Sequence, residues 1–253
     1  MKNKRPLIIA HRGYSRDYPE NTIAAFDAAV EAGADMIELD VTLSQDGQLV
    51  VIHDDTLNRT TDGEGFVCHQ QADDLLTLDA GRWFDDHPQT RPIPSLDEVM
   101  RRYAGRIPLN IEVKPFFPLS LTGKMQAALD RLVSDIKKLQ QSQDILLSSV
   151  NFFVLEYLRE RDADIRLGLV YRLPLTDFDP VYVCQRLDAW SMNPYHKQLT
   201  QPLLESMREI GVRVIPYTID KRKHMRRMIE LGVDGVFTGC IDWMQEECSS
   251  KGL

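Results

Sequence analysis

The feature that most constrains the fold is a regular alternation of short apolar runs, rich in β-branched residues, with longer segments of helical period. Such alternation is typical of parallel strands that are joined by helices. We expect strands at residues 7–10, 36–43, 49–52, 107–113, 145–150, 165–171, 189–192, 212–217 and 235–237. We expect helices at residues 22–31, 96–103, 123–141, 152–161, 201–210 and 221–231. The sequence therefore predicts an α/β fold built on a parallel sheet.

The expected strands are one too many for a closed barrel of eight βα units, and a turn signal indicates which one to set aside. Asp46-Gly47 separates the second run from the third and is typical of a tight hairpin. We therefore expect residues 49–52 to fold back antiparallel, which places Asp40 opposite His53. Eight parallel strands remain, and 253 residues suit a barrel of about 250 residues. The sequence predicts a single TIM (β/α)8 barrel domain over residues 1–253.

One segment does not follow the alternation. Residues 54–94 are rich in Asp, Gly and Thr, show little periodicity and are too many for a simple loop. We expect them to form a small insertion subdomain after the second strand.

Composition excludes several classes of protein. The chain has 38 Asp and Glu against 30 Lys and Arg, a net charge of -8, which works against binding to nucleic acid. A small anionic substrate is still compatible, because a site can be locally positive on an acidic protein. No stretch approaches 18 apolar residues, so we expect no membrane insertion. Four cysteines without a Cys-x-x-Cys pattern indicate reduced thiols and a cytoplasmic location, and a homo-oligomer is left open.

Carboxylates gather at the ends of two expected strands. Glu38 and Asp40 lie two residues apart on one strand, and Glu112 and Lys114 do so on another, so each pair shares a face. In a barrel these strand ends meet at the catalytic end. Three crowded carboxylates repel one another unless a cation separates them. The all-oxygen set of Glu38, Asp40 and Glu112 favours one hard divalent ion, Mg²⁺ or Ca²⁺ with Mn²⁺ as a further option, over zinc.

Two histidines and two cations complete this expected site. His11 ends the first strand and His53 ends the hairpin arm, where two imidazoles suit the roles of general acid and general base. Arg12 offers a planar fork to phosphate oxygens, and Lys114 adds a point charge. The pattern indicates metal-assisted phosphoryl transfer at a phosphodiester.

Several neighbouring residues carry weaker expectations. Glu20 either orients Arg12 or a histidine at the substrate site, or belongs to a plain loop. Tyr217 falls at a strand end and is a candidate for lining the substrate pocket. We expect Asn21 and Thr22 to cap the helix that follows them. The basic run 221–227 is typical of the solvated face of an amphipathic helix. Four further histidines have no motif around them and receive no role: His69, His87, His196 and His224.

Seven ordered motifs carry a resemblance that covers nearly the whole chain. They are His11-Arg12-Gly13, Pro19-Glu20-Asn21-Thr22, Glu38-Leu39-Asp40-Val41, Asp46-Gly47, Val51-Ile52-His53-Asp54, Asn58-Arg59-Thr60 and Ile111-Glu112-Val113-Lys114. In this order and spacing they resemble the signature of the glycerophosphodiester phosphodiesterase family. The chain is most similar to the compact cytosolic bacterial members of that family.

The resemblance implies a fold, a site and a reaction. It implies a barrel with an insertion after the second strand, a metal on the positions of Glu38, Asp40 and Glu112, and His11 with His53 as the acid–base pair. The glycerol hydroxyl of the substrate would attack the phosphorus, and water would then open the cyclic phosphate. Substrates such as glycerophosphocholine or glycerophosphoethanolamine would yield sn-glycerol 3-phosphate and a free alcohol.

Two other functions stay open at this point. One is that of a related barrel phosphodiesterase that acts on lysophospholipids or phosphoinositides. The lack of an apolar anchor favours a water-soluble substrate over this alternative. The other is that of a non-catalytic barrel that binds metal or a phosphorylated ligand, although a binding module needs no pair of histidines.

Overall fold

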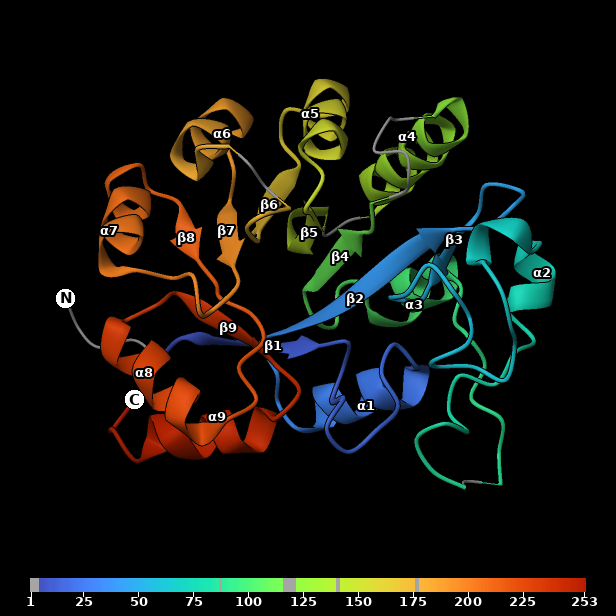
Figure 1. Ribbon diagram of the computed structural model, residues 1–253, viewed down its shortest axis with the longest axis horizontal. Coiled ribbons are helices and arrows are strands. Elements are labelled where there is room, and N and C mark those ends of the chain that lie inside the picture. The colour runs from blue at the N-terminus through green and yellow to red at the C-terminus, as the bar shows by residue number, and fades with distance from the viewer. Residues whose placement is uncertain (1–4, 87, 116–121, 140–141, 176–177) are drawn as a thin grey trace.

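The chain forms a ring of parallel strands surrounded by helices (Figure 1). The computed structural model describes residues 5–86, 88–115, 122–139, 142–175 and 178–253. The strands are hydrogen-bonded in the order β8-β7-β6-β5-β4-β2-β1-β9. Their bounds are β1 (Leu7–His11), β2 (Met36–Leu43), β4 (Leu109–Val113), β5 (Ile145–Ser149), β6 (Arg166–Tyr171), β7 (Ser191–Pro194), β8 (Arg213–Val214) and β9 (Gly235–Thr238). The predicted barrel of eight parallel strands is confirmed.

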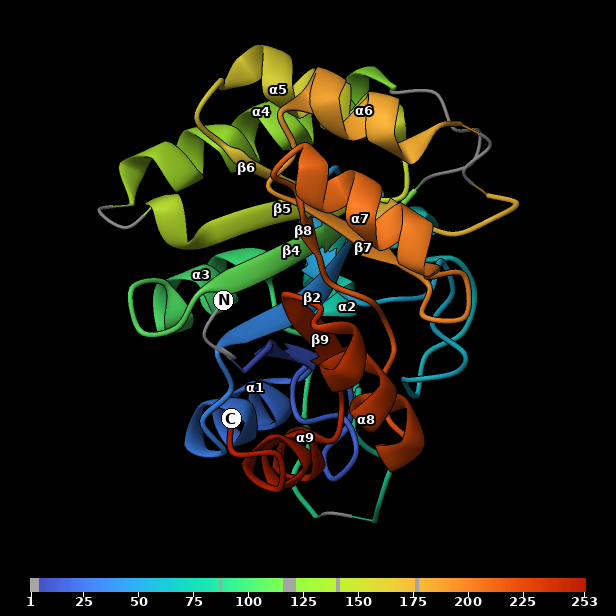
Figure 2. The same cartoon turned by 90° about the vertical axis from the view of Figure 1, so that its left-hand side faces the viewer.

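Helices connect successive strands and lie on the outside of the ring in both views (Figures 1 and 2). They are α1 (Ile23–Glu31), α3 (Leu96–Tyr103), α4 (Gly123–Lys138), α5 (Phe152–Arg161), α6 (Pro180–Leu187), α7 (Gln201–Glu209), α8 (Arg222–Leu231) and α9 (Ile241–Ser249), with a short 3-10 turn η2 (Ser142–Asp144) before β5. Two of them, α6 and α9, were not expected from the sequence. Helix α6 begins with Pro180 directly after its cap residue Asp179, a start that proline favours. The expected helix over residues 123–141 ends at Lys138, and residues 140 and 141 lie outside the described residues.

The ring closes at β8 and β9 by individual hydrogen bonds. The backbone N–H of Asp234 donates to Val214 (3.1 Å), and that of Phe237 donates to Pro216 (3.0 Å). The Asp234 carboxylate also accepts from the Val214 N–H (2.8 Å). Strand β8 is shorter than the predicted 212–217, because Pro216 has no N–H to donate to a ladder.

Strand β3 (Leu49–Val51) stands outside the ring and pairs antiparallel with β2, as the hairpin signal predicts. The predicted register is wrong by one residue. Val41 pairs with Val51, so Asp40 falls opposite Ile52 instead of His53. The cause is a three-residue loop, in which Ser44 accepts from the N–H of Gly47 and Gly47 takes a φ of +82° that suits glycine.

The chain between β3 and α3 has a small core of its own. It contains the 3-10 turn η1 (Val67–His69), the short helix α2 (Ala72–Leu75) and two isolated bridges. Its buried apolar residues are Val50, Ile52, Leu57, Val67, Ala72, Leu75, Ala80 and Ile93. His87 lies in this segment but outside the described residues. We propose that residues 54–94 are an insertion within one barrel domain.

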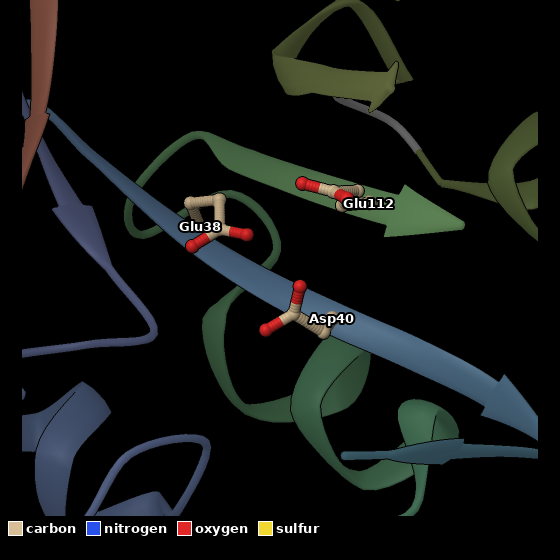
Figure 3. A group of neighbouring side chains, drawn as sticks. All are labelled: Glu38, Asp40 and Glu112. Atoms are coloured by element: carbon tan, nitrogen blue, oxygen red, sulfur yellow. The ribbon is translucent and has the colours of Figure 1, made fainter. Parts of the chain in front are cut away.

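The two faces of each strand separate the core from the site. On β2, Ile37 and Leu39 pack into the main core with the helices, whereas Glu38 and Asp40 point into the barrel (Figure 3). Inside the barrel a separate apolar cluster fills one level, made by Ile9, Met36, Leu146, Ile215 and Phe237. The register places His11 beside Glu38, two residues beyond the pair Ile9 and Met36, toward the carboxyl ends of the strands. The fold thus brings polar side chains together on an apolar floor.

Candidate active site

Three carboxylates from two neighbouring strands converge in the barrel (Figure 3). Asp40 and Glu112 are direct partners in the β2–β4 ladder, and Glu38 lies two residues before Asp40 on the same face. One oxygen from each of the three lies within 4.8 Å of the others. Glu38 and Asp40 are each 1% exposed, and Glu38 Oε1 has no hydrogen-bond partner among the described residues. A buried carboxylate oxygen without a partner fits a hard divalent cation at this position.

The charges around this trio are unequally balanced. Burial, reinforced by the charges of Asp40 and Glu112, raises the pKa of Glu38 well above its usual value. Burial acts in the same direction on Asp40, but Lys114 (3.2 Å) and Arg12 (3.3 Å) overcome it and lower the pKa of that carboxyl. Lys114 also contacts Glu112 at 2.7 Å. The unfavourable energy of a buried negative charge is therefore greatest at Glu38, and a bound cation would reduce it.

A sharp turn at the end of β1 aims Arg12 at the trio. Arg12 and Gly13 both have positive φ, at 58° and 82°. A Cβ on Gly13 would lie 2.7 Å from the carbonyl carbon of Ala25, so only glycine fits at this position. The backbone N–H of Arg12 donates to Glu38 Oε2 (2.8 Å), and its guanidinium donates to Glu20 Oε1 (2.8 Å). The turn thereby fixes both ends of the arginine.

The prediction that Asn21 and Thr22 cap α1 is correct for Thr22 and wrong for Asn21. Thr22 caps α1, because its hydroxyl accepts from the N–H of Ala25 (3.2 Å). Asn21 instead takes a φ of +58° and holds Asp40: its Nδ2 donates to Asp40 Oδ2 (2.8 Å), and its Oδ1 accepts from the Asp40 N–H (3.2 Å). Asn21 therefore belongs to the site, as a residue that positions a carboxylate.

His53 lies just beyond β3 and is held by a chain of charges. Its Nδ1 contacts Asp54 Oδ1 at 2.6 Å, and Arg59 Nε donates to the other oxygen of Asp54 at 2.6 Å. Arg59 also donates to both oxygens of Glu20, at 2.8 and 2.9 Å. The Arg59 hydrogen bonds lower the pKa of Asp54 to about 2. Glu20 therefore links the arginine that faces the trio to the arginine that holds the His53 partner.

His11 faces a different environment. Burial, reinforced by the neighbouring Arg12 charge, holds the pKa of His11 well below its usual value. The two histidines therefore differ in kind, since His53 has a carboxylate partner and His11 lies beside an arginine.

A cavity of about 600 Å³ opens over these groups. The predicted residues that line it are His11, Arg12, Glu38, His53, Glu112, Lys114 and Tyr217. Asp40 and Glu20 lie behind this wall, so Glu20 contacts Arg12 instead of the cavity. The structure thus brings the predicted site residues into one place, with Glu20 behind the others.

Sequence reasoning missed several residues that line this cavity or lie close to it. Tyr195, His196 and Lys197 directly follow β7, so the same rule of strand ends that singled out Glu38 would have found them. Asp54 and Arg59 stood inside motifs without a role. Inward-facing amides and hydroxyls on the strands gave no charge signal: Asn110, Ser148, Ser191 and Asn193.

The solvated-face prediction for the basic run 221–227 is confirmed for Lys221, Lys223, Arg226 and Arg227, which are exposed, but the run also makes contacts that the sequence did not predict. Lys221 and His224 line the cavity. Arg222 and Arg226 pair with Glu247 at 3.1 and 3.3 Å. Two further carbonyls, of His196 and Leu199, accept hydrogen bonds from Arg227. The run is anchored to its surroundings and contributes to the pocket.

Comparison with known proteins connects this geometry to a family. A model of the glycerophosphoryl diester phosphodiesterase family matches residues 11–242. The chain belongs to the glycerophosphoryl diester phosphodiesterase family. It is 38% identical to a glycerophosphodiester phosphodiesterase of Caldanaerobacter subterraneus subsp. tengcongensis, over 92% of this chain and 94% of that protein. It is 32% identical to one of Bacillus subtilis, over 94% of this chain and 85% of that protein.

Solved structures of this family agree with the fold. A glycerophosphodiester phosphodiesterase of Agrobacterium tumefaciens superimposes with a TM-score of 0.80 and 31% identity, covering 95% of this chain and 99% of that one. An Oleispira antarctica phosphodiesterase, solved in complex with the product sn-glycerol 3-phosphate, gives a TM-score of 0.83 and 30% identity over 97% of both chains. The resemblance seen in the motifs is confirmed, and the chain is an enzyme of a family that hydrolyses glycerophosphodiesters. Among the described residues, no helix is both long and apolar enough to span a membrane.

Proposed function

We propose that the protein hydrolyses glycerophosphodiesters, such as glycerophosphocholine or glycerophosphoethanolamine, to sn-glycerol 3-phosphate and an alcohol, with one divalent metal ion. The observation that carries the proposal is the convergence of the carboxylate trio with two histidines at one cavity. The product bound to the Oleispira antarctica phosphodiesterase supports the same substrate class.

Glu38, Asp40 and Glu112 would hold the ion, for which Mg²⁺ and Ca²⁺ are the leading candidates and Mn²⁺ a further one. When bound, such an ion polarises a phosphoryl oxygen and lowers the pKa of a nearby hydroxyl. Asn21 keeps Asp40 in place for this role through its two hydrogen bonds.

Arg12 and Lys114 would bind the phosphate of the substrate. Both are cations at the wall of the cavity, beside the carboxylates. Charge-assisted hydrogen bonds from such groups are about twice as strong as neutral ones. Glu20 positions Arg12 from behind, which accounts for its own place outside the cavity wall.

His11 and His53 would transfer the protons. The glycerol hydroxyl forms a bond to phosphorus and gives its proton to one imidazole, while the alcohol leaves with a proton from the other. Water then opens the cyclic phosphate with the roles reversed. Asp54 accepts from His53 Nδ1 and orients its ring, whereas burial and the Arg12 charge lower the pKa of His11, so we assign His53 as the first proton donor and His11 as the proton acceptor.

One assay tests the proposal. Release of glycerol 3-phosphate is measured from a panel of glycerophosphodiesters, with Mg²⁺, Ca²⁺ or Mn²⁺ and with excess chelator. We expect turnover with at least one ion and none with chelator. Absence of turnover with every ion would contradict the proposed reaction, and full activity in chelator would contradict the metal dependence.

A lysophospholipid is the second candidate substrate, on the basis of exposed apolar side chains near the cavity. Leu175 is 67% exposed and lines the cavity, and Leu173 and Phe153 are also exposed. Phosphorus NMR of the products from lysophosphatidylcholine and glycerophosphocholine separates the two substrates. The same spectra show whether the reaction stops at a cyclic phosphate.

We also propose a cytoplasmic location, and we leave a homo-oligomer open to test. None of the four cysteines forms a disulfide in the structure, which agrees with a reducing compartment. Cell fractionation tests the location. Sedimentation of the purified protein shows whether it forms a homo-oligomer.

A further inference from the structure

The cavity has a second side, away from the carboxylate trio, which we call the outer side. Arg172 follows β6, Tyr195 and Lys197 follow β7, and Lys221 and His224 lie at the start of α8. Strands β6 and β7 are neighbours in the ring, and α8 follows β8, the next strand beside β7 (Figure 1). If the phosphate lies beside Arg12, Lys114 and the trio, the outer side is where the alcohol part of a substrate can extend.

Positive charge dominates the outer side. Neither Lys197 nor Lys221 forms an ion pair within the described part of the chain, in contrast to Arg222 and Arg226 on the same helix, which pair with Glu247. Beyond the trio, one acidic side chain lines the cavity among the described residues, and it is Asp220. The cavity thus offers two unpaired ammonium groups to whatever occupies its outer side.

Asp220 is one negative charge against the two ammonium groups of Lys197 and Lys221, and among the described residues it forms an ion pair with neither. Its Oδ1 accepts from the Gly239 N–H at 2.8 Å and from the Thr238 hydroxyl at 3.1 Å. Burial raises the pKa of Asp220 above its usual value.

The aromatic ring on the outer side already has cations beside it. The Arg172 Cζ lies 5.3 Å from the centroid of the Tyr195 ring, and the Lys197 Nζ lies 5.7 Å from it. A quaternary ammonium is normally recognised by stacking on aromatic faces within about 6 Å. A choline group approaching Tyr195 would therefore meet like charges at the ring that should attract it.

The pKa values of two histidines on the outer side are lowered by burial and by the neighbouring positive charges. The rings of His196 and His224 lie 4.5 Å apart. Burial, followed by the charges of His224 and Lys197, lowers the pKa of His196 to about 4. Burial and then the Lys221 charge lower the pKa of His224. His196 is therefore neutral at pH 7, so it adds hydrogen-bonding capacity without adding charge.

We propose that the outer side of the cavity selects glycerophosphodiesters whose alcohol part carries a negative charge, a phosphate monoester or a carboxylate, over those that carry a quaternary ammonium. Lys197 and Lys221 are the residues that determine this preference. The inference rests on the proposed glycerophosphodiesterase function and narrows its substrate class, placing glycerophosphocholine among the poorer substrates.

The experiment compares kcat/KM for three substrates: glycerophosphoglycerol, the same compound with a terminal phosphate, and glycerophosphocholine. We expect the phosphorylated compound to exceed glycerophosphocholine at least ~10-fold at low ionic strength, mainly through KM, and the ratio to shrink in high salt because salt screens exposed charges. The substitutions Lys197→Glu and Lys221→Glu should each lower this ratio ~10-fold. Lys197→Met and Lys221→Met remove the charge without reversing it and should lower the ratio less.

Lys138→Glu is the matched control. Lys138 is 71% exposed at the end of α4, where the chain approaches the amino end of β5, so it lies at the opposite end of the barrel. This variant changes net charge by the same amount and should leave the ratio unaltered. An unchanged ratio in both Lys197→Glu and Lys221→Glu would overturn the inference, as would preference of the wild type for glycerophosphocholine.

A binding measurement keeps the two proposals distinguishable. Calorimetry with the metal-loaded His11→Ala variant, in which turnover is expected to be slow, gives the affinities for the phosphorylated compound and for glycerophosphocholine. If no glycerophosphodiester is hydrolysed by the wild type, the proposed function fails, and the affinity ratio still tests the charge preference. If hydrolysis occurs but neither ratio depends on Lys197 or Lys221, the inference alone fails.

Discussion

The two halves of the barrel wall differ in how their inward-facing polar groups are satisfied. In the first half, β1 to β4, cations and carboxylates contact one another directly, as Arg12 and Lys114 do with Asp40. In the second half, Ser148 on β5 and Asn193 on β7 are uncharged and buried, and their side chains have no hydrogen-bond partner among the described residues. Among the described residues, the charged side chains that line the cavity on this side, such as Arg172 and Lys197, follow the ends of the strands.

This difference indicates which half of the wall is suited to catalysis and which to binding the substrate. Charged side chains in a protein interior must be paired. A catalytic group of ionised side chains therefore needs neighbouring strands that place opposite charges beside it. An unpaired buried amide costs about 1–3 kcal/mol and is tolerated where it contributes to a cavity. We therefore expect the first half to carry the chemistry and the second half to shape the space for substrate.

The strongest way to break this division is to remove a carboxylate from the first half. Glu38→Gln and Asp40→Asn should each reduce kcat at least ~10³-fold, because a bound metal stabilises the transition state by several kcal/mol. Steady-state kinetics and metal titration by calorimetry measure both effects. Glu230→Gln, at an exposed site on α8, makes the same chemical change and should leave both values unaltered. Normal metal affinity in Glu38→Gln would show that the trio does not hold the ion.

Removing either histidine should have the next largest effect. His11→Ala and His53→Ala are expected to lower kcat about 10²- to 10⁴-fold, because each loses one proton-transfer step. Melting temperatures near the wild-type value would confirm an intact fold. The control is His69→Ala, an exposed histidine in η1. Near-normal turnover in both active-site variants would remove the histidines from the mechanism.

A smaller loss is expected when the support of His53 is weakened. Asp54→Asn leaves the ring of His53 without its carboxylate and should lower kcat roughly 10- to 100-fold, as loss of an orienting partner commonly does. Its kcat should fall more than its KM rises. An equal change in the Asp62→Asn control, made elsewhere in the insertion, would point to a general effect on that segment.

The second half should respond through affinity instead of rate. Asn193→Ala is expected to change KM by a few-fold, with kcat within about 3-fold of the wild type. Ser191→Ala should alter the free energy of unfolding by less than about 0.5 kcal/mol, because no hydrogen bond within the described residues is lost. Urea unfolding and steady-state kinetics test the two statements. A kcat loss in Asn193→Ala as large as that of His11→Ala would abolish the division between the halves.

The smallest expected effect is a pH-dependent contribution of Asp54 to stability. Its pKa is about 2 in the folded protein and about 4 in an unfolded chain, so it stabilises the fold above pH 4. The contribution is about 1 kcal/mol after solvent screening, and it is lost as the pH falls from about 4 through about 2. The difference in unfolding free energy between wild type and Asp54→Asn, measured at pH 6 and at pH 3, should narrow accordingly.

The sequence predicted the first half of the site more completely than the second, for a physical reason. Charged residues at strand ends, such as Glu38 and Lys114, are rare in a buried position and therefore stand out. The pleat alone then predicts which of them share a face. Asn193 and Ser148 carry no such signal, because a neutral polar residue in a strand is equally consistent with a solvent-facing side chain.

Register and loop contacts were harder to predict. The hairpin at Asp46-Gly47 was expected, but its three-residue loop moved Asp40 opposite Ile52. Asn21 was expected to cap a helix, because sequence cannot distinguish a side chain that bonds the backbone of its own segment from one that reaches Asp40 on the neighbouring strand. The barrel itself was predictable, since it depends on periodicity repeated along the whole chain.

The attachment of β3 has a consequence for how such a catalytic site can change during evolution. Strand β3 pairs with β2 alone and stands outside the ring of eight, yet it is the strand that delivers His53. One member of the histidine pair thus comes from the barrel and the other from an appendage. Deleting or replacing that appendage would leave the ring and the carboxylate trio in place while removing one proton carrier. On this barrel, the difference between a catalyst and a binding protein can therefore lie in one peripheral segment, the one that contains β3 and His53.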